Sequence, residues 1–190
     1  MSGAANGAVL VGGRSSRMGL PKGHVRWRGE SLLARALAAV RGAGLRPLVV
    51  GDASPYATEG ARVLADRPAN IGPLGGLRSV LLDGGGVVLA VDMPFVDVDD
   101  LRELVRAGLD APYASGSGFA PFPAWYAPSL LPLLDRQLER GVRSFRAFID
   151  AIPSRERTVV TLSPRCTQDW DTPEDVRASG GELPQGWPHG

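Results

Sequence analysis

Two short runs of apolar residues constrain the fold of this chain most strongly. Residues 8–11 (Ala-Val-Leu-Val) end at a pair of glycines, and residues 87–91 (Val-Val-Leu-Ala-Val) end at Asp92. Runs of this length without polar alternation are typical of strands buried on both faces of a parallel sheet. Because helices must then cover both faces of that sheet, the two runs predict an α/β fold.

Helix and strand patterns alternate along the first half of the chain. Apolar residues recur at helical spacing over residues 30–41, and glycines end that helix. We expect further helices over residues 75–82 and 99–106, and further strands over residues 48–50 and 62–65. This alternation favours layers of helices packed on one sheet.

The second half of the chain is less regular. Strand pieces are expected at residues 113–114, 124–126 and 158–162, and helices at residues 129–138, at residues 143–150 and from Thr172-Pro173 onward. A length of 190 residues suits one domain, and we see no repeat or linker that would divide it. We therefore expect a single domain over residues 1–179 and a disordered tail over residues 180–190, which holds glycine, proline and polar residues.

Composition and charge exclude several classes of protein. A net charge of +1 does not indicate a nucleic-acid binder. The lone Cys166 cannot form an internal disulfide, and with only two histidines it cannot build the usual kind of zinc site. No apolar run reaches the roughly 18 to 20 residues that a membrane span needs, and the N-terminus lacks the features of a signal peptide. We expect a cytoplasmic protein with no membrane or nucleic-acid partner.

The first apolar run opens into a loop that carries glycines, arginines and the only lysine of the chain. Gly12 and Gly13 would let backbone N–H groups approach phosphate oxygens. Arg17 and Lys22 would neutralise charge that develops on a leaving pyrophosphate. The spacing matches neither the Walker loop nor the dinucleotide-binding fingerprint. With 25 glycines in the chain, the glycine pair alone equally fits an ordinary turn, whereas the added arginine and lysine favour a phosphate-binding loop.

Asp92 follows the second apolar run directly. It is therefore expected at the carboxyl edge of the sheet, where open α/β sheets bind ligands. Mg²⁺ prefers carboxylate oxygens together with substrate phosphates, so Asp92 suits a metal that bridges the protein and a triphosphate. A turn-forming aspartate is the structural alternative. The nearby Asp97, Asp99 and Asp100 are interpreted as helix-capping and solvated acids.

Two further acidic positions permit both a structural and a functional interpretation. Asp66 ends a short strand before the glycine-rich residues 72–76 and a helix N-terminus, a place suited to an anion or a ribose. Taken alone, that segment fits a structural turn better. Asp171 precedes Thr172-Pro173, a typical start of a capped helix. Its functional interpretation is a second metal ligand or a contact to the substrate.

Taken together, these segments resemble the molybdenum cofactor guanylyltransferase family, one of the nucleotidyltransferases with a glycine-rich, Rossmann-like fold. The matching segments are Leu10-Val11-Gly12-Gly13-x-Ser15-x-Arg17-Met18-Gly19-x-x-Lys22, Asp66 with Gly72-Pro73-Leu74-x-Gly76, Val91-Asp92-Met93-Pro94-Phe95 and Asp171-Thr172-Pro173-Glu174-Asp175. They run in order from about residue 8 to residue 176. The resemblance implies a three-layer Rossmann-like fold, with a mostly parallel central sheet flanked by helices.

The resemblance also implies a reaction and a role for each matched position. The chain would transfer GMP from GTP to the terminal phosphate of the molybdopterin that carries molybdenum, and pyrophosphate would leave. By this resemblance, Leu10, Val11 and Gly12 would line the guanine and ribose. Gly13, Arg17 and Lys22 would cradle the triphosphate. Asp66 would contact the nucleoside, Asp92 would bind Mg²⁺, and the segment around Asp171 would contact the pterin or a second metal. Lys22, Arg17 and Asp92 would form the catalytic set.

Two positions depart from the pattern of that family, and alternatives stay open. Pro21 stands where an acidic residue often precedes the lysine, and Asp171 stands where the C-terminal motif usually has asparagine. The Gly12-Gly13 opening, where cytidylyl-transferring relatives tend to have Ala-Gly, favours guanine. The alternatives are a cytidylyltransferase, a nucleotidyltransferase with another phosphorylated acceptor, and a non-catalytic nucleotide-binding regulator or escort. Proteins that deliver the cofactor or accept the product are candidate partners.

Overall fold

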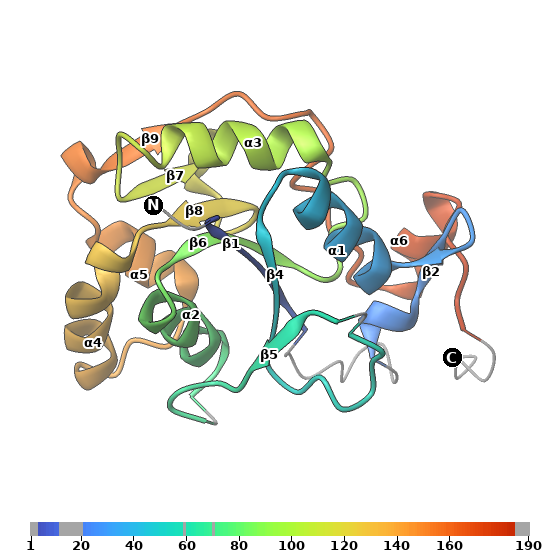
Figure 1. Cartoon of the computed structure of the whole chain (residues 1–190), viewed down its shortest axis with the longest axis horizontal. Helices are drawn as coiled ribbons and strands as arrows, with labels where there is room; N and C mark the ends of the chain where they lie inside the picture. The colour runs from blue at the N-terminus through green and yellow to red at the C-terminus, as the bar shows by residue number, and fades with distance from the viewer. Residues whose placement is uncertain (1–3, 12–20, 59, 70, 185–190) are drawn as a thin grey trace.

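The computed structural model describes residues 4–11, 21–58, 60–69 and 71–184. Its centre is a seven-stranded sheet with the strand order β5-β4-β1-β6-β8-β7-β9 (Figure 1). The strands are β1 (Asn6–Leu10), β2 (Arg26–Trp27), β3 (Glu30–Ser31), β4 (Arg46–Val50), β5 (Arg62–Leu64), β6 (Gly86–Ala90), β7 (Tyr113–Ser115), β8 (Ala124–Tyr126) and β9 (Arg157–Val159). Within the seven-stranded sheet only β8 runs antiparallel to its neighbours, which confirms the mostly parallel sheet.

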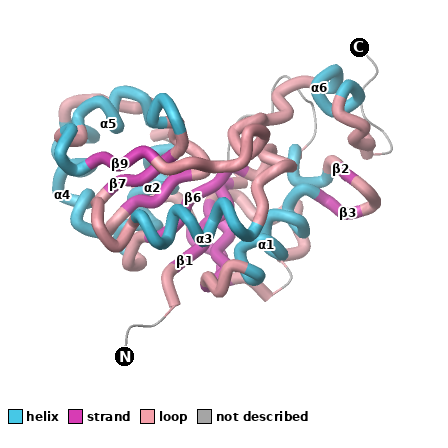
Figure 2. The backbone as a smooth tube through the Cα atoms, turned by 90° about the horizontal axis from the view of Figure 1, so that it is seen from above, coloured by secondary structure: helices cyan, strands magenta, loops and turns pink. Residues whose placement is uncertain are grey.

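Helices cover both faces of this sheet. They are α1 (Leu32–Gly42), α2 (Pro73–Leu82), α3 (Val98–Ala107), α4 (Leu131–Glu139), α5 (Phe145–Ala151) and α6 (Pro173–Ala178), with short 3₁₀ turns at Lys22–His24, Ser117–Phe119, Pro128–Leu130 and Ser154–Glu156. Helices α1 and α3 pack on one face, and α2, α4 and α5 pack on the other (Figures 1 and 2). The three-layer arrangement expected from the resemblance is therefore confirmed.

The side chains of the central strands alternate between two apolar cores, as strand geometry requires. In β1, Val9 packs with residues of α1 and α3, whereas Ala8 and Leu10 pack with residues of α2. All three side chains are buried, so the first apolar run forms a strand enclosed on both faces. This arrangement leaves only the carboxyl ends of the strands and their loops free to carry chemistry.

Helix α3 begins with a reciprocal cap. Asp97 accepts from the backbone N–H groups of Asp99 and Asp100, and the Asp100 carboxylate accepts in return from the backbone N–H of Asp97. The capping interpretation of these acids is confirmed. Asp100 is not a solvated acid, however: it is buried and accepts from both the backbone N–H and the hydroxyl of Ser163, each at 2.7 Å. Its second partner lies 63 residues away, beyond the reach of a local pattern.

A small third cluster lies beside the main sheet. Its buried residues are Val25, Leu32, Trp170 and Val176. It joins the β2–β3 hairpin to α6, which lie at one end of the molecule (Figure 2). The sequence patterns did not predict the hairpin, because two-residue strands show no periodicity.

Part of the segment expected to be a disordered tail is paired with this hairpin. Glu182 and Arg26 exchange two backbone hydrogen bonds, of 2.7 and 2.9 Å. Residues 185–190 lie outside the described residues. Within the described ranges, no helix combines the length and the apolar character that crossing a membrane requires.

Candidate active site

Three residues that are distant in the sequence meet at the carboxyl edge of the sheet. The Lys22 ammonium lies 2.7 Å from Oδ2 of Asp92 and 2.5 Å from Oδ1 of Asp171. The side chains of Lys22 and Asp92 are 16% and 17% exposed, whereas Asp171 is 56% exposed. The fold thus brings together the lysine and the two carboxylates singled out in the sequence.

Lys22 is positioned by the 3₁₀ turn that it begins. The backbone N–H of Val25 donates to the Lys22 carbonyl at 3.0 Å, which closes the turn. Gly23 lies against the ring of Tyr56, where a Cβ atom would come within 2.6 Å of the ring, and its N–H donates to the Tyr56 hydroxyl at 3.3 Å. A residue with a side chain at position 23 would therefore clash with the Tyr56 ring, and the ring or the turn that carries Lys22 would have to shift.

Asp92 lies just beyond the end of β6, which pairs with β1. The backbone N–H of Val91 donates to the Leu10 carbonyl at 3.1 Å, so the pairing of the two strands continues to the residue before Asp92. The Met93 N–H then turns back to the Ala90 carbonyl at 3.3 Å. The chain therefore bends at Asp92, and the carboxylate lies at the edge of the sheet.

Asp171 is held beside Asp92 through its neighbours. The backbone N–H of Trp170 donates to the Asp92 carbonyl at 2.9 Å, and the buried Trp170 ring packs edge-on against Phe95. Thr172 is the N-cap of α6 and forms a capping box with Asp175. The helix cap expected here is present, but it is made by Thr172. Asp171 lies one residue before the cap, and its carboxylate is paired with Lys22.

The electrostatics of this triad favour a charged lysine. Burial acts to lower the pKa of Lys22, but the Asp92 and Asp171 carboxylates outweigh it and raise the pKa above its usual value. A third carboxylate belongs to the neighbourhood: burial, followed by the charges of Asp171 and Asp92, raises the pKa of Asp169. Among the described residues, the carboxylates of the site thus outnumber the single ammonium that pairs with them.

The chemistry of these side chains suits a divalent cation that is shared with a substrate. Among the described residues, no group of three or more His, Cys, Asp or Glu side chains could hold a metal by itself. Asp92 and Asp171 do, however, have oxygen atoms within hydrogen-bond distance of one cationic atom, Nζ of Lys22. Mg²⁺ is usually held by one or two carboxylates together with substrate phosphates and water, so the pair fits a metal that arrives with phosphate.

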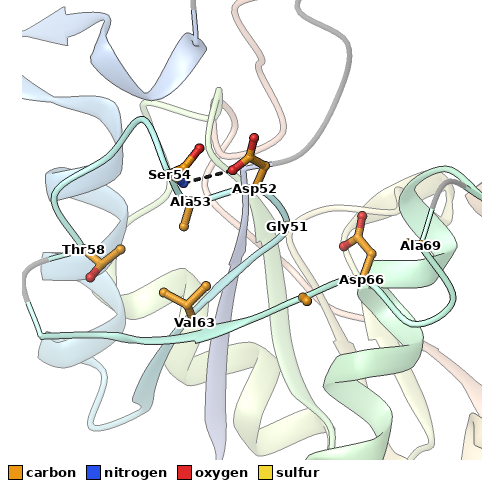
Figure 3. Close-up of a pocket in the computed structure, with 9 residues that line it drawn as sticks. Gly51, Asp52, Ala53, Ser54, Thr58, Val63, Asp66 and Ala69 are labelled. Atoms are coloured by element: carbon orange, nitrogen blue, oxygen red, sulfur yellow. Dashed lines mark hydrogen bonds between the residues drawn. The ribbon is translucent and has the colours of Figure 1, made fainter.

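A pocket of about 640 Å³ opens at the same edge of the sheet. Asp52 follows β4, Asp66 follows β5, and both line the pocket together with Val63 (Figure 3). Burial raises the pKa of Asp66. Burial, and to a smaller extent the charges of Asp52 and Asp92, raise the pKa of Tyr56. The volume of the pocket falls in the range of small-ligand sites.

Helix α2 holds the segment that carries Asp66. The Ala65 carbonyl accepts from the Ser79 hydroxyl at 2.7 Å, and the Arg67 N–H donates to the Gly75 carbonyl at 3.1 Å. A Cβ atom on Gly75 would lie 2.5 Å from the Pro68 carbonyl oxygen. The glycine-rich residues 72–76 therefore form the N-cap and the first turn of α2, and Gly75 is required for close packing.

We expect Gly75→Ala to destabilise the protein by about 1–3 kcal/mol, because the added methyl group meets backbone rather than a flexible side chain. The displaced segment carries Asp66, the predicted nucleoside contact, so we also expect the KM for the nucleotide to rise. Gly116→Ala is the matched control, since its Cβ would meet side-chain atoms alone, the nearest being the end of Leu162 at 3.3 Å. Urea unfolding and steady-state kinetics measure both effects. Equal stability of the two variants would contradict the prediction.

The remaining predicted site residues fall into two groups. Gly12, Gly13 and Arg17 lie outside the described residues. Leu10 and Val11 are described at the end of β1: the Leu10 side chain is buried in the core, and the Val11 N–H donates to the Val50 carbonyl at 3.0 Å. Their roles toward a nucleotide stay predictions.

Sequence reasoning missed three residues of this region. Asp52 could have been found, because it follows the apolar run 48–50 closely, much as Asp92 follows its own run. Tyr56 and Asp169 carried no comparable signal. Tyr56 acts by packing against the turn that begins at Lys22. Asp169 is influenced by the charge of Asp92, which is distant in the sequence.

A lysine paired with two carboxylates, beside a pocket at the edge of a mostly parallel sheet, is an arrangement that suits a nucleotidyltransferase of the Rossmann-like type. The chain belongs to the MobA-like NTP transferase family, whose domain model matches residues 7–157. A probable molybdenum cofactor guanylyltransferase of Opitutus terrae is 33% identical over 187 residues, covering 90% of this chain and 93% of the relative.

Solved structures agree with this assignment. Molybdopterin-guanine dinucleotide biosynthesis protein A from Archaeoglobus fulgidus is 25% identical with a TM-score of 0.72, over 92% of this chain and 96% of that one. A Mycobacterium tuberculosis protein crystallised in complex with manganese has a TM-score of 0.70 at 21% identity, over 92% of this chain and 97% of that one. This second likeness concerns the fold alone.

Proposed function

We propose that this protein transfers GMP from GTP to the terminal phosphate of molybdopterin-bound molybdenum cofactor and releases pyrophosphate. The observation that carries the proposal is the meeting of Lys22, Asp92 and Asp171 at one edge of the sheet, next to the pocket of Asp66. Family membership supports the same reaction, since the Opitutus relative is named for it.

The pocket supports guanine as the base. Among the described residues that line it, the polar side chains are Asp52, Ser54, Thr58 and Asp66, and none is basic. Carboxylates only accept hydrogen bonds when ionised. The Watson–Crick edge of guanine offers adjacent N–H donors, whereas cytosine offers a single amino group beside an acceptor. A lining rich in acceptors therefore favours guanine.

The proposed reaction needs positioning and charge neutralisation more than acid–base chemistry. An oxygen of the acceptor phosphate attacks the α-phosphorus of GTP, and the bond from that phosphorus to the oxygen shared with the β-phosphate breaks. The attacking phosphate is already anionic, so no general base is required. Lys22, with Arg17, neutralises the charge on the departing pyrophosphate. Asp66 orients the nucleoside in its pocket.

Mg²⁺ is the metal we propose for this site, held by Asp92 and, as a second ligand, by Asp171. When bound, it supplies charge neutralisation on the phosphate oxygens and helps to align them. The exposed position of Asp171 also suits a contact to the acceptor.

A panel of nucleotides tests the proposal. We expect purified protein, molybdenum cofactor and Mg²⁺ to give the guanine dinucleotide product with GTP, and transfer from CTP, ATP and UTP slower by roughly tenfold or more. Product mass and pyrophosphate release are the measurements, and reactions without the acceptor are the control. Preferred transfer from CTP would assign the chain to cytidylyl transfer instead. Binding of GTP with no product from any nucleotide would favour a non-catalytic regulator or escort.

A cytoplasmic location and partner proteins stay predictions.

A further inference from the structure

We propose that Lys22 excludes divalent metal from Asp92 and Asp171 until a nucleoside triphosphate draws its ammonium away, so that metal and nucleotide bind in a coupled manner. The proposal rests on the proposed function for the identity of the nucleotide. It concerns a role of Lys22 in the free protein, before any chemistry takes place.

Lys22 and a divalent metal would compete for the same carboxylate oxygens. Nζ of Lys22 lies 2.7 Å from Oδ2 of Asp92 and 2.5 Å from Oδ1 of Asp171, so one cationic group already bridges the two carboxylates. Mg²⁺ or Mn²⁺ shared by these carboxylates would use the same oxygen atoms. An ammonium and a divalent ion cannot both occupy this position without a close contact between like charges.

The ion pair between Lys22 and Asp92 is largely shielded from water. The Lys22 and Asp92 side chains are both more than four-fifths covered, so water screens their interaction less than it would at the surface. Within the described residues, the ion pairs of Asp92 and Asp171 are both made with Lys22. The charge that holds the carboxylates together is therefore concentrated in one side chain.

The phosphates of a nucleotide would release Lys22 from the two carboxylates. A triphosphate offers several anionic oxygens, and a lysine ammonium binds such oxygens as a point charge. Once Lys22 moves to the phosphates, Asp92 and Asp171 lose their counter-ion next to the nearby Asp169, and a divalent cation restores the balance. Nucleotide then raises the affinity for metal, and metal raises the affinity for nucleotide by the same factor.

Binding of Mn²⁺ without nucleotide, followed by electron paramagnetic resonance, tests the proposal. We expect Lys22→Met to bind Mn²⁺ on the order of tenfold or more tighter than the unmodified protein, because the competing charge is gone. Lys22→Arg keeps the charge and should bind Mn²⁺ as weakly as the unmodified protein. Arg62→Met is the matched control, since it removes one positive charge from a separate ion pair with Asp83. An equal gain in Arg62→Met would overturn the proposal.

A second arm uses only the unmodified protein, so it does not depend on the stability of a variant. We expect its Mn²⁺ affinity to rise on the order of tenfold or more when GTP is added, measured against Mn²⁺ binding to GTP alone. Tight Mn²⁺ binding without GTP, unchanged when GTP is added, would overturn the proposal. Failure of the proposed function has a different signature: Mn²⁺ binding changes as expected, but no nucleotidyl product forms with any nucleotide.

Discussion

Asp92→Asn is expected to reduce nucleotidyl transfer by on the order of 10³-fold or more, with the native fold retained. The substitution changes one carboxylate oxygen to an amide nitrogen. It leaves in place the backbone carbonyl of Asp92, which accepts from the Trp170 N–H. The strand pairing that ends at Val91 is also unaffected. What is lost is a negative charge at the point where the proposed reaction requires a cation together with the phosphates that it binds.

Pyrophosphate release under saturating GTP measures this effect, and thermal unfolding shows whether the fold is retained. Asp99→Asn is the matched control, because Asp99 is an exposed carboxylate on the helix that follows and is paired with Arg102. We expect the control to keep near-normal transfer. Near-normal transfer by Asp92→Asn itself would show that the proposed metal ligand is wrong.

The central sheet could be predicted because its strands are buried on both faces. A run such as residues 87–91 has no polar alternation, and in so short a segment this pattern is typical of a parallel strand between two layers of helices. The position of Asp92 followed from the same pattern, since the residue after such a strand lies at the edge where ligands bind. The residues on either side of a strand end were therefore the most informative part of the sequence for locating the sheet and the site.

The partners within the site could not be predicted by any local pattern. Lys22 and Asp171 are separated by 149 residues, and their contact depends on how Trp170 packs against Phe95. The Thr172 cap was readable because capping is local. The family resemblance indicated a role for the Asp171 segment, but pairing of its carboxylate with the lysine required the tertiary structure.

The β2–β3 hairpin could not be predicted either, because residues distant in the sequence hold it in place. Its strands have two residues each, and Arg26 finds its additional backbone partner at Glu182, near the end of the described chain. No periodicity or propensity operates over such short elements. A buried cluster of Val25, Leu32, Trp170 and Val176 holds the hairpin in place instead.

Lys22→Met is expected to lower kcat for nucleotidyl transfer by on the order of 10²-fold, the cost of removing one charge-stabilising donor from a reaction centre. In the same variant we expect Mn²⁺ to bind more tightly without nucleotide. These opposite changes separate two roles of one side chain. In the proposed scheme, the ammonium competes with the metal in the free protein and neutralises departing pyrophosphate during the reaction.

A purely structural lysine would give a different result. Loss of the ion pairs to Asp92 and Asp171 would then lower stability, and kcat and metal affinity would fall together with the folded fraction. Lys22→Arg distinguishes the cases further, because a guanidinium keeps the charge but presents it as a broad planar fork. We expect Lys22→Arg to exclude Mn²⁺ like the unmodified protein while recovering only part of the lost kcat. Full activity in Lys22→Met would remove the lysine from the mechanism, since no other lysine exists in the chain to replace it.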